Sequence, residues 1–452
     1  GPAGAFMEIK PFCRKGIKMF EKEYHEKLTT PQEAVSMIAE NALLAHGNLQ
    51  AEPPALLKAI ENRIRSNDLK KLRVFHLGTS VYASGTILSP ELADCVEAYP
   101  CFVLTKERGL VYGGLSQFIP NYFHQLGRLI EEYLDEMDVV MTTVSPMDKA
   151  GFFSFGTSVD ITSIVWKRAK HRIVEVNRHM PRVFGDALVH LSEVDQIVEN
   201  HQPIWESPPA QPDDIDRAIG RIVAEMVPDE ATIQLGFGNL PNAVATQLVN
   251  HKNLGIHTEA FSPVMVDLVK KGVITGKKKT LHPNKHVYSF ALGDHEMMEF
   301  MNDNPAFEGY PVSYTNNPEV IARNDNMISI NATLQVDLSG QCNSEYLEGA
   351  QFSATGGQLD FVRGAFNAKG GKSILTFRST AKKNTVSRIV PQLDAGTIVT
   401  TPRMDTHYLV TEYGAADLKG KCMRDRALAI IGIAHPDFRE PLMREAEKMR
   451  LF

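Results

Sequence analysis

The stretch Thr232–Asn242, which reads TIQLGFGNLPN, decides the fold class of this chain. A buried strand is predicted to end at Leu235, and two glycines follow it one residue apart. We expect Asn239 to cap the next helix and Pro241 to lie in its first turn, where no N–H donor is required. A strand that turns through glycines directly into a helix is typical of α/β proteins.

The same alternation of strand-like and helix-like segments continues along the chain. Apolar runs predict strands over residues 72–77, 139–144, 172–176, 232–235, 287–291, 327–330 and 397–400. Between two of them, the segment 214–227 repeats apolar residues at helical spacing: Ile215, Ile219, Ile222, Val223 and Met226. We therefore expect an α/β fold with largely parallel sheets.

A proline-rich segment, Ile204–Asp214, divides the chain into two parts of similar size. It has three prolines and few apolar residues, which is typical of a linker. The 452 residues fit two domains of roughly 200 residues each. We expect an N-terminal domain over residues 7–207 and a C-terminal domain over residues 208–452. The six residues before Met7 are interpreted as an expression scar.

The composition argues against several classes of protein. A net charge of -6 does not favour nucleic acid as a partner, because phosphate binding needs a basic face. No apolar run approaches the ~20 residues of a membrane span. The five cysteines have no Cys-x-x-Cys spacing, so we interpret them as reduced thiols of a cytoplasmic protein. No close His/Cys cluster predicts a metal site.

The loop Gly236–Asn239 is the first candidate for chemistry. Backbone N–H groups at the start of a helix bind anions, here a phosphate or the oxyanion of a tetrahedral intermediate. A plain strand-to-helix turn is the alternative interpretation. The dinucleotide fingerprint Gly-x-Gly-x-x-Gly is not met, because its third glycine is replaced by Pro241.

Glu259 is the second candidate. It follows a predicted strand in Gly255–Phe261, and Ser262 and Pro263 are expected to start the next helix. Ligands of open α/β sheets bind at the carboxyl ends of the strands. If this strand and the strand ending at Leu235 are neighbours, Glu259 faces the glycine loop. A lone glutamate is usually a solvated surface residue, but the apolar flanking residues favour a half-buried setting here.

Three further features are candidates for the site, and two of them have two interpretations. The adjacent glycines Gly356 and Gly357 allow close approach of a ligand or form a turn between strands. Asn331 is polar in a strand-like context and needs a partner if it is buried. Phe152 and Phe153 line an acyl pocket or belong to the core. No Gly-x-Ser-x-Gly elbow and no complete P-loop supports a serine hydrolase or an NTPase.

Several of these segments together resemble the acetyl-CoA hydrolase/transferase family, and within it the 4-hydroxybutyrate and butyrate/acetate CoA-transferases. The resemblance begins with Gly236–Val244, His257–Glu259 and Asp267–Thr275. Further matches are Glu175–Asn177, Met180–Arg182, Val336–Leu338, Gly340–Gln341, Gly356–Phe361 and Val410–Leu418. They extend from about residue 20 to 448.

The resemblance implies two fused open α/β CoA-transferase domains with the active site at their interface. It places the catalytic glutamate at Glu259. It places the CoA contacts at Gly236, Phe237, Gly238, Asn239, Leu240 and Gly357, with a further one near Asn331. The backbone N–H groups near Phe237 and Gly357 are the candidate oxyanion donors. Phe237 departs from the family pattern, where a smaller aliphatic residue is expected.

The activity implied is transfer of CoA from a short-chain acyl-CoA to a carboxylic acid such as acetate, through a Glu259–CoA thioester. CoA and its thioesters are then substrates rather than permanently bound cofactors, and neither ATP nor a metal is required. The family suggests a homodimer or a larger homo-oligomer. Two alternatives stay open: an acyl-CoA hydrolase that uses the same Glu259, and a non-catalytic CoA-binding protein, against which the intact glutamate counts.

Overall fold

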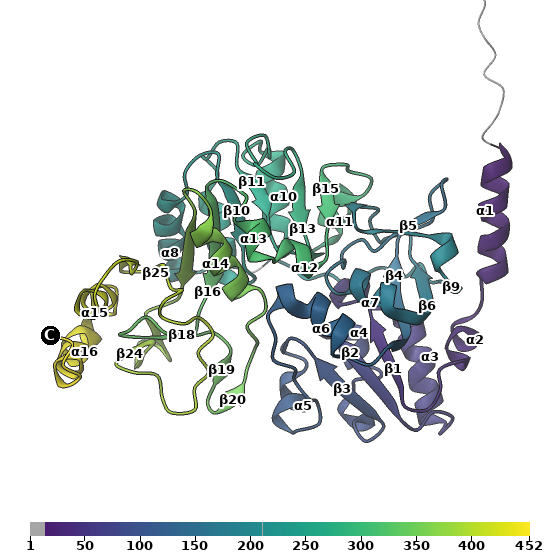
Figure 1. The fold of residues 1–452 in the computed structure, drawn as a ribbon, viewed down its shortest axis with the longest axis horizontal. Coiled ribbons are helices and arrows are strands. Elements are labelled where there is room, and N and C mark those ends of the chain that lie inside the picture. The colour runs from purple at the N-terminus through teal and green to yellow at the C-terminus, as the bar shows by residue number, and fades with distance from the viewer. Residues whose placement is uncertain (1–13, 210) are drawn as a thin grey trace, which may run out of the picture.

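The structure is a computed structural model, and it describes residues 14–209 and 211–452 (Figure 1). The first half of the chain is built on a six-stranded sheet in the order β3-β2-β1-β4-β6-β9, in which every pair is parallel. Its strands are β1 (Ala42–His46), β2 (Leu72–His76), β3 (Val96–Pro100), β4 (Met137–Val144), β6 (Ala169–Val176) and β9 (Gln196–Glu199).

The second half is built on a nine-stranded sheet in the order β26-β25-β21-β16-β10-β11-β13-β15-β7, whose edge strand β7 comes from the first half. Only β25 and β26 pair in antiparallel fashion within it. Its strands are β7 (Phe184–Gly185), β10 (Thr232–Leu235), β11 (Gly255–His257), β13 (His286–Tyr288), β15 (Phe307–Gly309), β16 (Met327–Ala332), β21 (Lys372–Thr376), β25 (Tyr408–Thr411) and β26 (Gly414–Asp417).

Helices cover both sheets, and the remaining strands are short and form small separate sheets. The helices of the first half are α1 (Arg14–Lys27), α2 (Pro31–Ser36), α3 (Pro54–Arg65), α4 (Val81–Ser84), α5 (Arg108–Tyr112), α6 (Leu126–Glu132) and α7 (Thr162–Arg168). Those of the second half are α8 (Asp214–Met226), α9 (Asn239–Gln247), α10 (Pro263–Lys270), α11 (His295–Met301), α12 (Val312–Thr315), α13 (Pro318–Ile321), α14 (Gln358–Asn367), α15 (Met423–Gly432) and α16 (Pro436–Lys448).

The remaining strands are short. They are β5 (Phe152–Ser154), β8 (Leu188–His190), β12 (Ala260–Phe261), β14 (Phe290–Ala291), β17 (Gln335–Asp337), β18 (Cys342–Asn343), β19 (Tyr346–Leu347), β20 (Ala350–Gln351), β22 (Thr380–Ala381), β23 (Val386–Ser387) and β24 (Ile389–Val390). Figure 1 shows the two halves side by side, with α1 and α16 at opposite ends of the molecule.

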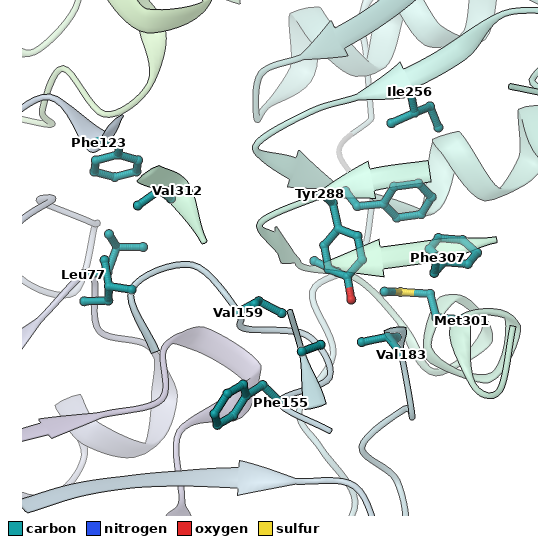
Figure 2. Packing of buried hydrophobic residues seen from close by; sticks show 14 of the residues in the cluster. Leu77, Phe123, Phe155, Val159, Val183, Ile256, Tyr288, Met301, Phe307 and Val312 are labelled. Atoms are coloured by element: carbon teal, nitrogen blue, oxygen red, sulfur yellow. The ribbon is translucent and has the colours of Figure 1, made fainter. Parts of the chain in front are cut away.

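One continuous apolar core runs from the first half into the second. Figure 2 shows Leu77 and Phe123 of the first half near Val312 of the second. Elsewhere in the same core, the hydroxyl of Tyr288 donates a hydrogen bond of 2.8 Å to the carbonyl of Gly156. The halves therefore share buried surface, which fixes their relative position.

The segment between the two sheets has no helix or strand among its described residues, 200–209 and 211–213. Gln50 of the first half holds this segment in place through hydrogen bonds. The Gln50 amide donates to the carbonyls of Trp205 and Gly293, both at 2.7 Å, and it accepts from the Gly293 N–H at 3.1 Å. The division of the chain near residue 208 stays a prediction. None of the described helices is long and apolar enough to cross a membrane.

The expected α/β fold with largely parallel sheets is confirmed, but two local predictions are wrong. Residues 397–400 form no strand, because Ile398 and Val399 lie exposed in a loop and have no sheet to join. Asn239 does not cap α9: the helix begins at Asn239 and its N-cap is Gly238. Gly238 has a φ of 115°, a conformation that glycine adopts far more readily than asparagine.

The aromatic cluster around Phe307, on β15, predicts that Phe307→Ala strongly lowers the stability of the protein. Phe307 is fully buried, and its ring meets the rings of Phe261 and His286 at centroid distances of 5.0 and 5.1 Å. We expect the free energy of unfolding to fall by about 3–5 kcal/mol, measured by denaturant titration. Tyr133, which is 70% exposed, is the matched control, and Tyr133→Ala should change it by less than about 0.5 kcal/mol. Equal effects would contradict this assignment of the core.

Candidate active site

A cavity of about 600 Å³ lies between the two halves, at the carboxyl ends of β2, β10 and β11. The first half contributes Leu77, Gly78, Phe102 and Lys106 to its wall, among other residues. The second half contributes Gly236, Phe237, Glu259, Ala260, Phe290, Leu292, Asn331 and Gly357. Most of this lining is apolar, and Glu259 is its one carboxylate among the described residues.

Glu259 lies between β11 and β12, at the edge of the sheet where the glycine loop also lies. The two lie together because β10 and β11 are parallel neighbours, with Thr232 opposite Gly255, as the sequence led us to expect. The backbone carbonyl of Glu259 accepts hydrogen bonds from Ser289 and Phe290, both at 3.0 Å. These bonds fix the backbone from which the carboxyl projects into the cavity.

Two donors hold the Glu259 carboxyl. The side-chain amide of Asn316 donates to Oε2 at 2.5 Å, and the backbone N–H of Gly357 donates to the same carboxyl. Asn316 is fully buried and follows directly after α12. Sequence reasoning missed Asn316, because it belongs to no motif and lies 57 residues from Glu259 along the chain.

Gly357 is a glycine because the carboxyl lies against it. A Cβ atom on Gly357 would lie 2.0 Å from Oε2 of Glu259 and 2.2 Å from Nδ2 of Asn316, far inside van der Waals contact. The φ of Gly357 is -95°, so the backbone itself would accept a side chain. The segment leads into α14 rather than between two strands, so the interpretation as a turn between strands is wrong, and close approach of a ligand stays a prediction.

The environment makes Glu259 an unusual carboxyl. Burial raises its pKa to about 7, and the nearby carboxyls of Asp360 and Asp160 act in the same direction. The hydrogen bonds from Asn316 and Gly357 oppose this shift, because they favour the ionised form. Glu259 is therefore an anion at slightly alkaline pH, half-buried in a largely apolar cavity, and a poorly solvated carboxylate is a better nucleophile.

The structure brings only part of the predicted glycine loop to the cavity. Gly236 and Phe237 line it, and the Phe237 ring lies 6.4 Å from the ring of Phe290 in a stacked arrangement. Gly238 and Asn239 are exposed and Leu240 is half-buried, and none of these three is part of the lining. Their predicted contacts with CoA stay predictions.

Asn331 lines the cavity, but its side chain already has partners. It exchanges two hydrogen bonds with the amide of Gln234, at 2.9 and 3.1 Å, and it donates to Ser329 at 3.1 Å. The partner that a buried asparagine requires is thus Gln234, on the neighbouring strand β10. The predicted CoA contact near Asn331 stays a prediction.

Phe152 and Phe153 belong to the core region and not to the cavity. Phe153 is fully buried in the shared core, and Phe152 meets the ring of His190 at 4.9 Å. Neither residue lines the cavity, so the acyl-pocket interpretation of this pair is wrong. The aromatic residues that do line it are Phe102, Phe123, Trp205, Phe237, Phe290, Phe352 and Phe361.

Fold and site together define an α/β enzyme with a buried carboxyl set beside backbone and amide N–H donors. Models of the acetyl-CoA hydrolase/transferase N-terminal and C-terminal domains match residues 13–205 and 293–446. A 4-hydroxybutyrate coenzyme A transferase of Clostridium kluyveri is 44% identical, over 95% of this chain and 99% of that protein. The chain therefore belongs to the acetyl-CoA hydrolase/transferase family.

Two further comparisons agree. A butyryl-CoA:acetate CoA-transferase of Anaerostipes caccae is 37% identical, over 96% of this chain and 98% of that protein. The crystal structure of RipA from Yersinia pestis superimposes with a TM-score of 0.92 at 49% identity. It covers 96% of this chain and 100% of that one, so the similarity includes both halves.

The contact between Gly357 and the carboxyl predicts that Gly357→Ala inactivates the enzyme without unfolding it. The added methyl group displaces Glu259 or Asn316, and we expect kcat to fall at least about 100-fold, since a displacement of ~1 Å can cost that much. Gly432, at the end of α15, provides the control, because a Cβ atom added there would meet no heavy atom of the described residues within 4 Å. Gly432→Ala should keep full activity. A fully active Gly357→Ala enzyme would show that the carboxyl is not held there.

The raised pKa of Glu259 predicts a pH-dependent difference in stability between the wild type and Glu259→Gln. The folded state binds this proton more tightly than the unfolded chain, where glutamate has a pKa of ~4.3. The stabilisation is therefore complete below pH ~4.3 and is lost as the pH rises through about 7. Thermal midpoints measured from pH 4 to 8 should fall more steeply for the wild type.

Other buried carboxyls with raised pKa values, such as Glu107 and Glu175, are present in both proteins and cancel in this difference. A difference that stays constant over the whole pH range would mean that Glu259 titrates normally.

Proposed function

We propose that the protein moves coenzyme A between an acyl-CoA and a carboxylic acid through a covalent thioester on Glu259. The protein is a CoA-transferase, and its relatives that transfer CoA match over nearly its full length. The observation that supports the covalent route is the buried Glu259 carboxyl, held by Asn316 and Gly357 inside an apolar cavity.

The first step is attack of a Glu259 oxygen on the thioester carbonyl of the acyl-CoA. The C–S bond breaks, CoA leaves as a thiolate, and a mixed anhydride forms between the acyl group and Glu259. The thiolate then attacks the glutamyl carbonyl. The anhydride C–O bond breaks, which releases the first acid and leaves a Glu259–CoA thioester. A second carboxylate reverses these steps, so one thioester is exchanged for another and no ATP is consumed.

The two donors at Glu259 stabilise the transition state of the second step, in which the CoA thiolate attacks the glutamyl carbonyl. When the thiolate adds to the glutamyl carbonyl, negative charge develops on a Glu259 oxygen, and the Gly357 N–H and the Asn316 amide already face that carboxyl. Loss of one oxyanion donor typically costs ~2.7–4 kcal/mol of transition-state stabilisation. The backbone N–H of Phe237, in the loop that lines the cavity, is the proposed donor for the acyl-group oxyanion.

We propose CoA contacts at Gly236, Phe237, Gly238, Asn239, Leu240, Asn331 and Gly357. Gly236, Phe237, Asn331 and Gly357 line the cavity, and the other three continue the glycine loop. CoA enters and leaves as a substrate in this scheme. We also propose a homodimeric or larger enzyme in the cytoplasm. The family resemblance supports the first point, and the free thiols of Cys95, Cys101, Cys342 and Cys422 support the second.

The acceptor is proposed to be a short-chain carboxylate and not water. Bulk water is ~55 M, so a transferase has to exclude it and hold the acid in attack geometry. Leu77, Phe102, Phe237, Phe290 and Leu292 supply an apolar wall around Glu259 that opposes hydration. The relatives named for 4-hydroxybutyrate and for butyryl-CoA with acetate support acids of two to four carbons.

The test is to trap the intermediate and then to discharge it. Incubation with butyryl-CoA alone, followed by peptide mass mapping, should show a CoA adduct on the peptide that contains Glu259. Acetate should convert this adduct to acetyl-CoA much faster than buffer releases free CoA. Glu259→Ala, the control, should bind CoA and form no adduct.

An adduct on another residue, such as Cys342, would refute the assignment of the nucleophile. Free CoA released at the same rate with and without acetate would make the protein a hydrolase that uses the same glutamate.

A further inference from the structure

His257 lies two residues before Glu259 on β11, and its side chain is fully buried. Its Nε2 atom lies 2.8 Å from the backbone carbonyl of Thr315, the last residue of α12. Because a carbonyl oxygen only accepts hydrogen bonds, the ring carries its proton on Nε2 and donates it to Thr315. The next residue along the chain is Asn316, whose amide donates to Glu259.

Together these contacts form a closed ring of covalent bonds and hydrogen bonds that includes Glu259. One side of the ring is the backbone from His257 to Glu259, and the other is the peptide that joins Thr315 to Asn316. Two hydrogen bonds connect the sides: His257 to the Thr315 carbonyl at 2.8 Å, and Asn316 to the Glu259 carboxyl at 2.5 Å. The first bond therefore sets where the Asn316 amide stands relative to the carboxyl.

The His257 ring also packs towards the other donor. Its centroid lies 6.3 Å from that of Phe361, in the first turn of α14, and the Phe361 N–H donates to the Gly357 carbonyl at 3.0 Å. His257 thus ends the strand before Glu259 and contacts both the helix before Asn316 and the helix after Gly357. Among the described residues no donor or acceptor meets its Nδ1 atom.

His257 is uncharged at neutral pH. Burial lowers its pKa to about 3, and the neighbouring Lys279 and His282 act in the same direction. Among the described residues no hydrogen bond joins the His257 ring to the Glu259 carboxyl, whose pKa is raised by burial and by Asp360 and Asp160. The contribution of His257 is geometric.

We propose that His257 is a positioning residue: its hydrogen bond to the Thr315 carbonyl holds the Asn316 amide on Glu259 and thereby sets the rate at which the Glu259–CoA adduct forms. This inference rests on the proposed function of Glu259. It assigns to His257 no contact with the substrate, and it therefore predicts an effect on the chemical step rather than on CoA binding.

The test replaces His257 by two amide side chains of different length. In His257→Gln the amide nitrogen replaces Nε2 and still reaches Thr315, whereas in His257→Asn it is too short. We expect His257→Asn to slow formation of the Glu259–CoA adduct about 100-fold with little change in KM for butyryl-CoA, because a displacement of ~1 Å costs this much. His257→Gln should stay within about threefold of the wild type. His257→Leu, which adds no buried polar group, replaces the asparagine variant if that one does not fold.

The pH profile of adduct formation gives a second readout that simple destabilisation would not move. The Asn316 hydrogen bond lowers the pKa of Glu259. Loss of its alignment should therefore shift the acidic limb of the profile to higher pH in His257→Asn, and not in His257→Gln. Asp160, Asp360 and Lys279 are unchanged in both variants, so they contribute equally to both profiles.

Two controls separate positioning from folding. His286 is another buried histidine, on the adjacent strand β13, and it has no hydrogen bond to the residues of α12 that the structure describes; His286→Asn should lower stability and leave the adduct rate unchanged. In an Asn316→Ala background, His257→Asn should cause little further loss, because both changes remove one interaction.

Additive losses, or equal losses in His257→Gln and His257→Asn, would overturn the positioning role. Absence of any adduct on Glu259 in the wild type would instead refute the proposed function, so the two failures are distinguishable.

Discussion

The burial of one carboxyl, that of Glu259, is the constraint on which the rest of the site depends. A carboxylate in an apolar cavity is costly, and burial therefore raises the pKa of Glu259 to about 7. The same burial makes the anion reactive once it forms. The Asn316 amide and the Gly357 N–H reduce this cost without restoring full hydration, since each supplies one donor and excludes water from that position. The absence of a side chain on Gly357 follows directly from this arrangement.

Holding those donors in place requires both halves of the chain. The loop with Gly356 and Gly357 belongs to the second half, but the first half presses on it: the Phe123 N–H donates to the Gly356 carbonyl at 3.3 Å. His124 lies 2.5 Å from Asp360, in the first turn of α14, and Phe102 packs where a Gly356 side chain would stand. A separated second half would retain Glu259 but lose this support. Glu259 therefore lies in a cavity whose lining and underlying core come from both halves.

The sequence predicted what is local and missed what depends on distant contacts. The fold class and the position of Glu259 at a strand end followed from the residues immediately around them, because strand, glycine turn and helix are encoded within about ten residues. Asn316 was missed, since it reaches Glu259 only after α12 docks against β11 through His257. The Gln234–Asn331 pair depends on the neighbouring positions of β10 and β16, which no local pattern reveals. The apolar run at 397–400 misled because apolar residues also occur in exposed loops.

The two halves use their strand-to-helix turns differently. Strand β2 of the first half also turns through a glycine, Gly78, into a helix, and the N–H groups of Ser80, Tyr82 and Ala83 would form an anion-binding site there. They are already occupied: all three donate to the carboxylate of Glu52, at 2.6 to 3.0 Å. In the second half, no carboxylate of the described residues fills the corresponding loop in this way, and Gly236 and Phe237 face the cavity. The helix start of the first half is thus occupied by a carboxylate of the chain itself, whereas the corresponding loop of the second half faces the cavity.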